Sequence, residues 1–114
     1  MKESENIYSN ICNVIANSIK EDWLDSILVI EYTENYQTFE GTYTNLTGQI
    51  LELDVGEISV ELDEEISELY EITVTGHDDR WNELIFYLSN NGALKVYFIW
   101  NQDFQNGRLE QNSK

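Results

Sequence analysis

The side chains that usually carry out catalysis are scarce in this chain. Its 114 residues include one histidine, His77, and one cysteine, Cys12. Covalent catalysis needs a nucleophile beside a base, and Cys12 falls on an apolar helical stripe, where a thiol packs rather than reacts. The sequence has no glycine-rich phosphate loop and no nucleophile-elbow pattern. We therefore predict that the protein is not an enzyme and binds no cofactor.

The tripeptide His77-Asp78-Asp79 is the one place where metal ligands of different kinds adjoin. It offers few ligands at no recognised spacing, and the chain has no second histidine. No segment combines the alternating acids, central glycine and final glutamate of a helix-loop-helix calcium site. We therefore expect a solvated turn here and predict no metal site.

Carboxylates are abundant enough that their pairing says little. With 22 acidic residues, some pair will always lie at the separation that glycoside hydrolysis requires. A small enzyme that works through carboxylates is therefore the least favoured alternative.

The charge of the chain is its most informative property. The chain has 22 acidic and six basic residues, which gives a formal net charge of −16. Such a field repels nucleic acid and anionic membranes, and it attracts and selects basic protein surfaces. Solubility alone is the alternative explanation, but a much smaller charge already provides it. We therefore expect a basic protein partner.

The acids are concentrated between positions 52 and 71, where nine of them occur without a base. Like charges at helical spacing cost ~0.2–0.5 kcal/mol per pair in an isolated helix, and nothing local offsets this cost. An ordinary solvated helix face is the alternative, and the sequence does not decide between the two. The predicted partner-binding residues are Glu61, Glu64, Glu65, Glu68 and Glu71, followed by Asp78 and Asp79.

Hydrophobic periodicity predicts the other elements. Apolar residues at helical spacing indicate a helix over residues 4–20, and alternation indicates strands over residues 26–34, 38–43 and 49–55. Residues 57–62 fit both a strand and a helix. A second helix is predicted over residues 63–75, with Asp63 as its N-cap and Gly76 as its stop.

Residues 81–100 predict a β-hairpin around Asn90-Asn91-Gly92. A three-residue loop with Gly92 in the left-handed conformation keeps one face wholly apolar, which a one-residue slip would destroy. It pairs Leu88 with Leu94, Phe86 with Val96 and Leu84 with Phe98. Tyr87 and Tyr97 lie on the second face of the hairpin. They are candidate partner contacts if that face is uncovered, but packing under a helix is the favoured alternative.

These elements predict an α+β protein in the order α-β-β-β-α-β-β. Short connections favour a single antiparallel sheet of about five strands with two helices on one face. Residues 1–114 are expected to form a single domain, with 101–114 as a loose tail. No apolar run is longer than five residues, too few for a membrane span or a signal peptide, so we expect a cytoplasmic protein.

Two segments resemble the YezG-like family of antitoxin or immunity proteins. The first runs from Asn6-Ile7-Tyr8 through a helix to Glu21-Asp22-Trp23, then through a strand to an aromatic-rich segment at positions 39–43. The second has Trp81, Leu84, Phe86 and Leu88, the Asn-Gly turn, then Val96 and Phe98. The resemblance implies an α+β immunity protein that binds and inactivates a co-encoded toxin domain, commonly a nuclease, and has no catalytic residues. The alternative is a DNA-mimic inhibitor of a DNA-binding enzyme.

Overall fold

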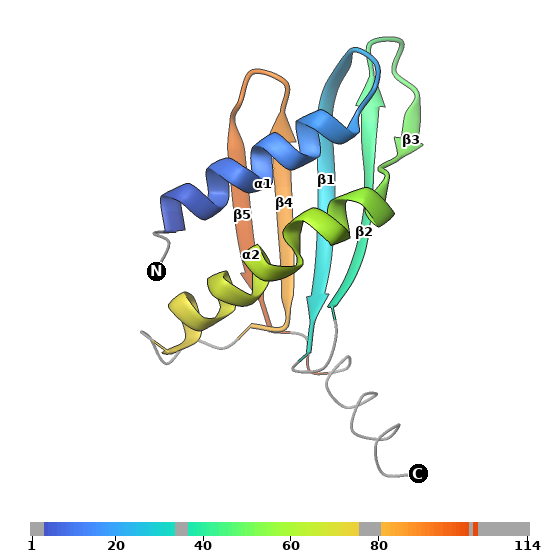
Figure 1. Cartoon of the computed structure of the whole chain (residues 1–114). Helices are drawn as coiled ribbons and strands as arrows, with labels where there is room; N and C mark the ends of the chain where they lie inside the picture. The colour runs from blue at the N-terminus through green and yellow to red at the C-terminus, as the bar shows by residue number, and fades with distance from the viewer. Residues whose placement is uncertain (1–3, 34–36, 76–80, 101, 103–114) are drawn as a thin grey trace.

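The computed structural model describes residues 4–33, 37–75, 81–100 and 102. Over these residues the chain forms two helices and one five-stranded antiparallel sheet, in the predicted order α-β-β-β-α-β-β (Figure 1). The elements are α1 (Ser4–Ser18), β1 (Trp23–Tyr32), β2 (Gln37–Asn45), β3 (Ile50–Glu52), α2 (Val55–Thr75), β4 (Glu83–Ser89) and β5 (Leu94–Ile99). The predicted fold class is therefore confirmed. Apart from Gln102, the expected C-terminal tail lies outside the described residues.

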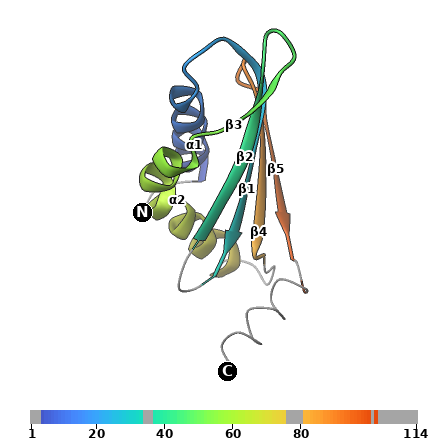
Figure 2. The ribbon, with the colours of Figure 1, turned by 90° about the vertical axis from the view of Figure 1, so that its right-hand side faces the viewer.

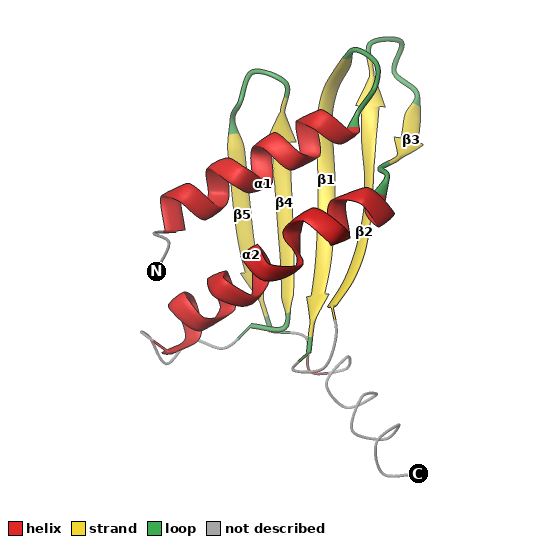
Figure 3. Ribbon diagram, viewed as in Figure 1, coloured by secondary structure: helices red, strands yellow, loops and turns green. Residues whose placement is uncertain are grey.

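The sheet has the strand order β3-β2-β1-β4-β5, with the long strand β1 at its centre. Both helices lie on the same face of the sheet and cross the strands obliquely (Figures 2 and 3). No described helix covers the opposite face. Over the described residues the protein therefore has two layers, and one side of the sheet is open.

The core fills the space between the sheet and the two helices. Apolar residues at positions i and i+4 line one side of each helix, and alternate residues of β1 and β4 line the sheet. Burying each such side chain contributes ~1.5–3 kcal/mol. The most deeply buried members are Ile7, Ile11, Ile15, Leu28, Ile30, Ile58, Leu62, Ile66, Leu69, Leu84 and Phe86.

The β4–β5 hairpin has the predicted register. Leu88 pairs with Leu94, Phe86 with Val96 and Leu84 with Phe98. Gly92 adopts a φ of 92°, and its backbone N–H donates to the Ser89 carbonyl over 2.9 Å. Because most other residues avoid this backbone conformation, glycine is the residue that lets the three-residue loop close.

The predicted start of the second helix, at Asp63, was wrong. Helix α2 begins at Val55, and its N-cap is Asp54, whose Oδ1 accepts a 3.1 Å hydrogen bond from the backbone N–H of Glu57. Residues 57–62 are therefore helical. A strand would have turned Ile58, Val60 and Leu62 to one face, but Val60 is 80% exposed while the other two are fully buried.

The third strand is shorter than the predicted 49–55 because the chain turns inward after Glu52. Leu53 is buried, and its backbone N–H donates to the Gly41 carbonyl over 3.0 Å. A Cβ atom on Gly41 would lie 2.7 Å from Leu53 Cδ1, so the glycine provides the space for this leucine. Leu53 thereby anchors the connection from the sheet edge to α2.

An aromatic cluster joins the C-terminal part of α2 to the sheet. Tyr32 stacks on Tyr70 at a centroid distance of 4.3 Å, and Trp81 meets Tyr70 edge-on at 5.0 Å. Phe98 of β5 is 5.7 Å from Trp81. Such pairs add ~0.5–1.5 kcal/mol each beyond the burial of their area. The cluster thus links the C-terminal part of α2 to β1 and β5.

Candidate partner-binding surfaces

The outward face of α2 carries a continuous row of carboxylates. Its members are three or four residues apart, so they share one side of the helix, which flanks the buried stripe. Four are exposed and Glu68 is half-buried. We call this row the acidic ridge, and it consists of Glu57, Glu61, Glu64, Glu68 and Glu71. At 1.5 Å per residue it extends over about 21 Å.

The structure sets Glu65 apart from the other predicted residues of the helix. It lies two turns after the buried Ile58 on the same side of α2 and is 8% exposed. A carboxylate in this position cannot reach the surface of a partner. Glu61, Glu64, Glu68 and Glu71 are brought together as predicted, and Glu57 joins them because the helix begins earlier than expected.

The other predicted site residues, Asp78 and Asp79, lie outside the described residues, as does His77. Among the described residues, no three histidine, cysteine, aspartate or glutamate side chains gather as a metal site would require. Cys12 is half-buried, and this burial raises the pKa of its thiol. A raised pKa disfavours the nucleophilic thiolate.

Basic side chains are absent from α2. The seven acids of this helix have no lysine or arginine among them. Across the described part of the chain, the basic side chains are Lys20, after α1, and Lys95, on β5. Lys20 Nζ donates to the Asn17 carbonyl over 2.6 Å. The ridge therefore presents negative charge that no basic residue of its own helix offsets.

The second surface is the open sheet face, formed by the strand side chains that point away from the helices. The strand register arranges twelve of them in three rows. These are Thr42–Ile27–Tyr87–Lys95, Glu40–Val29–Ile85–Tyr97 and Thr38–Glu31–Glu83–Ile99. The first two rows have apolar centres, and the third has a carboxylate pair at its centre.

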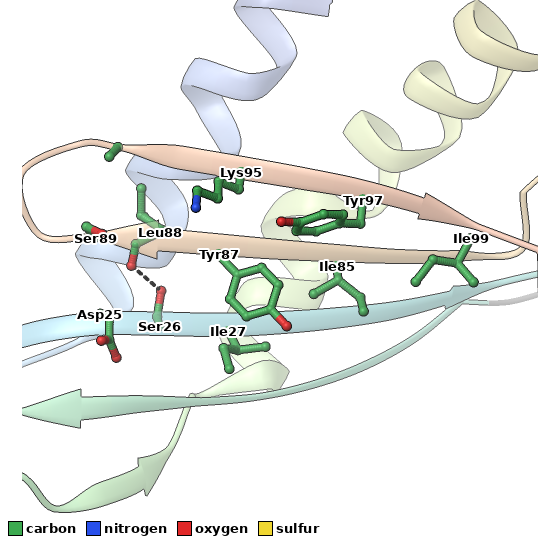
Figure 4. Close-up of a pocket in the computed structure, with 11 residues that line it drawn as sticks. Asp25, Ser26, Ile27, Ile85, Tyr87, Leu88, Ser89, Lys95, Tyr97 and Ile99 are labelled. Atoms are coloured by element: carbon green, nitrogen blue, oxygen red, sulfur yellow. Dashed lines mark hydrogen bonds between the residues drawn. The ribbon is translucent and has the colours of Figure 1, made fainter.

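Tyr87 and Tyr97 are exposed on this face, so the favoured prediction that they pack under a helix was wrong. They are 39% and 47% exposed, and Ile27 is 37% exposed. Both helices pack on the opposite side of the sheet, as Figure 4 shows behind the strands. The alternation of apolar residues along the hairpin signals two apolar faces. It carries no information on whether helices cover one face or both.

The apolar centre of the open sheet face forms a shallow groove of about 650 Å³. Ile27 and Ile85 contribute to its wall, together with Tyr87, Tyr97 and Ile99 (Figure 4). The rings of Tyr87 and Tyr97 meet edge-to-face, with centroids 5.6 Å apart and planes at 90°. This contact holds two aromatic side chains in place at the surface.

One end of the open sheet face is acidic. Glu31 of β1 lies directly opposite Glu83 of β4, and Glu40 lies on β2 in the adjacent row. Burial raises the pKa of Glu31, and the charges of Glu83 and Glu40 raise it further. Like charges placed opposite each other on neighbouring strands destabilise a sheet, and the carboxylates of Glu31 and Glu40 make this end of the face suited to a basic group.

No protein-family model matches the chain, and no curated protein matches it. The resemblance to the YezG-like family stays a prediction. The structure adds one general constraint, since no described helix is long and apolar enough to cross a membrane.

Proposed function

We propose that the protein is an immunity protein, or antitoxin, that binds and neutralises a basic bacterial toxin domain in the cytoplasm. The observation that carries this proposal is the acidic ridge on α2, five carboxylates in a row on a helix without basic residues. The helix turns this row outward because Leu62, Ile66 and Leu69 anchor its other side in the core. The resemblance to immunity proteins points to the same function.

The charge of the ridge suits a nuclease as the toxin. A nuclease holds the phosphate backbone of its substrate through lysine and arginine side chains, so the surface around its active site is positive. The ridge extends over about 21 Å, which is about the length of six base pairs at 3.4 Å each. A carboxylate row of this length could cover such a surface and exclude the substrate. The inhibition requires no chemistry from the protein itself.

Affinity capture from the source cell, with the whole chain as bait, tests this proposal. The bait is compared with a ridge variant, Glu64→Lys, and with a control variant, Asp22→Lys, which changes the net charge equally outside the ridge. We expect the wild type and the control to retain one dominant basic protein and the ridge variant to lose it. The captured protein should degrade nucleic acid when alone and be inhibited when the wild type is added.

Two outcomes would contradict the proposal. Retention of the same partner by Glu64→Lys would remove the ridge from the interface. Capture and inhibition of several unrelated DNA-binding enzymes would support a DNA mimic instead of an immunity protein.

A further inference from the structure

We propose that the open sheet face is a second docking surface, for a protein segment whose apolar centre is flanked by basic residues. This inference does not depend on the acidic ridge or on the toxin-binding function, because the two surfaces lie on opposite layers of the protein (Figure 2).

The open sheet face has apolar side chains that are exposed to solvent. Ile27, Tyr87 and Tyr97 are each more than one-third exposed and occupy adjacent rows of the sheet. Val29 and Ile85 lie between them and are half-buried. Contiguous exposed apolar patches mark interaction sites on soluble proteins, and tyrosine is among the residues that contribute most to such interfaces. This face therefore has the composition of an interface centre.

The face is also organised before a partner binds. Its side chains project from four strands that three antiparallel ladders hold in register. The edge-to-face contact between Tyr87 and Tyr97 restricts both rings. Ordering flexible side chains costs ~0.5–1.5 kcal/mol each on association, so a surface that is already ordered loses less affinity.

The charges on the face identify the kind of occupant. Glu31, Glu40 and Glu83 adjoin the apolar centre, and Lys95 is the one basic residue of this face in the described part of the chain. The raised pKa of Glu31 reports its burial and the repulsion from Glu83 and Glu40. Basic side chains placed over Glu31 and Glu40 would relieve the repulsion between these two carboxylates.

A second copy of the chain fits the face less well. Packing two open sheet faces together would bring the carboxylates of both copies into one interface, and each copy carries a net charge of −16. Like-charge contact in an interface costs several kcal/mol. The charge pattern therefore selects a basic partner over self-association.

Two synthetic hairpin peptides of equal positive charge can serve as defined probes. One has a leucine and tryptophan centre with lysine flanks, and the other has serines in place of its apolar residues. Amide chemical shifts of the ¹⁵N-labelled chain are followed at physiological salt. We expect the amphipathic peptide to shift amides of β1, β4 and β5 and to bind at least about tenfold more tightly than the serine peptide.

Variants locate the binding on the protein. Ile27→Lys and Tyr97→Ser should each weaken binding of the amphipathic peptide, while Val60→Lys, at an exposed apolar position of α2, should not. Tyr97 lies on an edge strand and is nearly half exposed. Tyr97→Ser should therefore keep the fold even if Ile27→Lys unfolds the protein. Glu64→Lys should also retain this binding, because it changes only the ridge. A failure of the ridge hypothesis would therefore leave this result unchanged.

Three results would overturn the inference. The first is equal affinity for the two peptides, and the second is a set of shifts confined to α2. The third is a dimer in sedimentation that Ile27→Lys converts to a monomer, which would identify a second copy as the occupant.

Discussion

Trp81 donates a hydrogen bond from its indole Nε1 to the Thr73 hydroxyl over 2.7 Å. The same hydroxyl donates to the Leu69 carbonyl over 2.8 Å, inside α2. Trp81 is 2% exposed and precedes β4, so this bond joins the last turns of α2 to the β4–β5 hairpin. The orientation of the acidic ridge therefore depends on a contact made on the opposite side of its helix.

Replacing Thr73 with valine should destabilise the protein, because it leaves the buried indole N–H without its acceptor. An unsatisfied buried donor costs ~1–3 kcal/mol. The free energy of unfolding from urea titration would measure the loss. Thr73→Ser keeps the hydroxyl and should stay closer to the wild type. Equal stability of the two variants would show that the Trp81 bond contributes nothing.

Two glycine-to-alanine substitutions should have opposite effects. At Gly41 an added Cβ would lie 2.5 Å from the Ile27 carbonyl oxygen and 2.7 Å from Leu53 Cδ1, so Gly41→Ala should cost ~1–3 kcal/mol by overpacking. At Gly56, in the first turn of α2, the nearest contact would be an ordinary 3.6 Å. Gly56→Ala should therefore stabilise by ~0.5–1 kcal/mol through helix propensity. Thermal unfolding measures both, and a stable Gly41→Ala variant would contradict the packing described for Leu53.

Glu31→Gln should stabilise the protein at neutral pH. Its pKa is raised in the folded state by burial and by Glu83 and Glu40, so folding favours the protonated form. Below the ordinary pKa of a glutamate carboxyl, ionisation of Glu31 therefore costs the folded protein nothing. The cost grows as the pH rises through the raised folded-state pKa of Glu31. We expect Glu31→Gln to raise the free energy of unfolding by ~0.2–1 kcal/mol at pH 7, the contribution of one cross-strand pair. This gain should disappear in acid.

Unfolding of wild type and Glu31→Gln across the acidic and neutral range would measure this difference. Glu52→Gln is the matched control, because Glu52 lies opposite Thr42 rather than opposite another acid. A gain from Glu31→Gln that did not change with pH would show that removal of the charge is not its cause.

Reversing one charge in the acidic ridge should stabilise the isolated protein. A lysine at position 64 would lie three residues after Glu61 and four before Glu68, which turns two repulsive pairs into attractive ones. At ~0.2–0.5 kcal/mol per pair, the gain for Glu64→Lys should reach about 1 kcal/mol. Glu64→Gln should gain about half as much. Urea unfolding of both variants measures the effect, and a loss of stability would mean that Glu64 makes a favourable contact within the fold.

The sequence was most informative where neighbouring signals agreed. In the hairpin, the alternation of Leu84, Phe86 and Leu88 and the position of Gly92 allowed a single register, which the structure has. For α2, Asp63 was predicted as the N-cap, but Asp54 caps the helix. The residue before this cap, Leu53, packs over Gly41, a contact between distant segments that local patterns do not contain.

The candidate surfaces were predictable to different degrees. Helical spacing placed Glu61, Glu64, Glu68 and Glu71 together, since that depends on the helix alone. The same spacing could not separate Glu65, because its burial depends on how α2 lies on the rest of the fold. The exposure of Tyr87 and Tyr97 likewise follows from both helices packing on one face, which the period of a strand does not specify.

The association rate with the captured toxin, measured as a function of salt, decides whether the acidic ridge is the toxin-binding surface. The measurement compares the wild type with Glu64→Lys and with the control Asp22→Lys. If the acidic ridge steers and holds a basic toxin, the wild type and the control should associate rapidly at low salt and slow steeply as salt rises. Glu64→Lys should associate more slowly and depend less on salt, although it is the more stable protein. The same rate and the same salt dependence for all three proteins would contradict the claim that the acidic ridge is the toxin-binding surface.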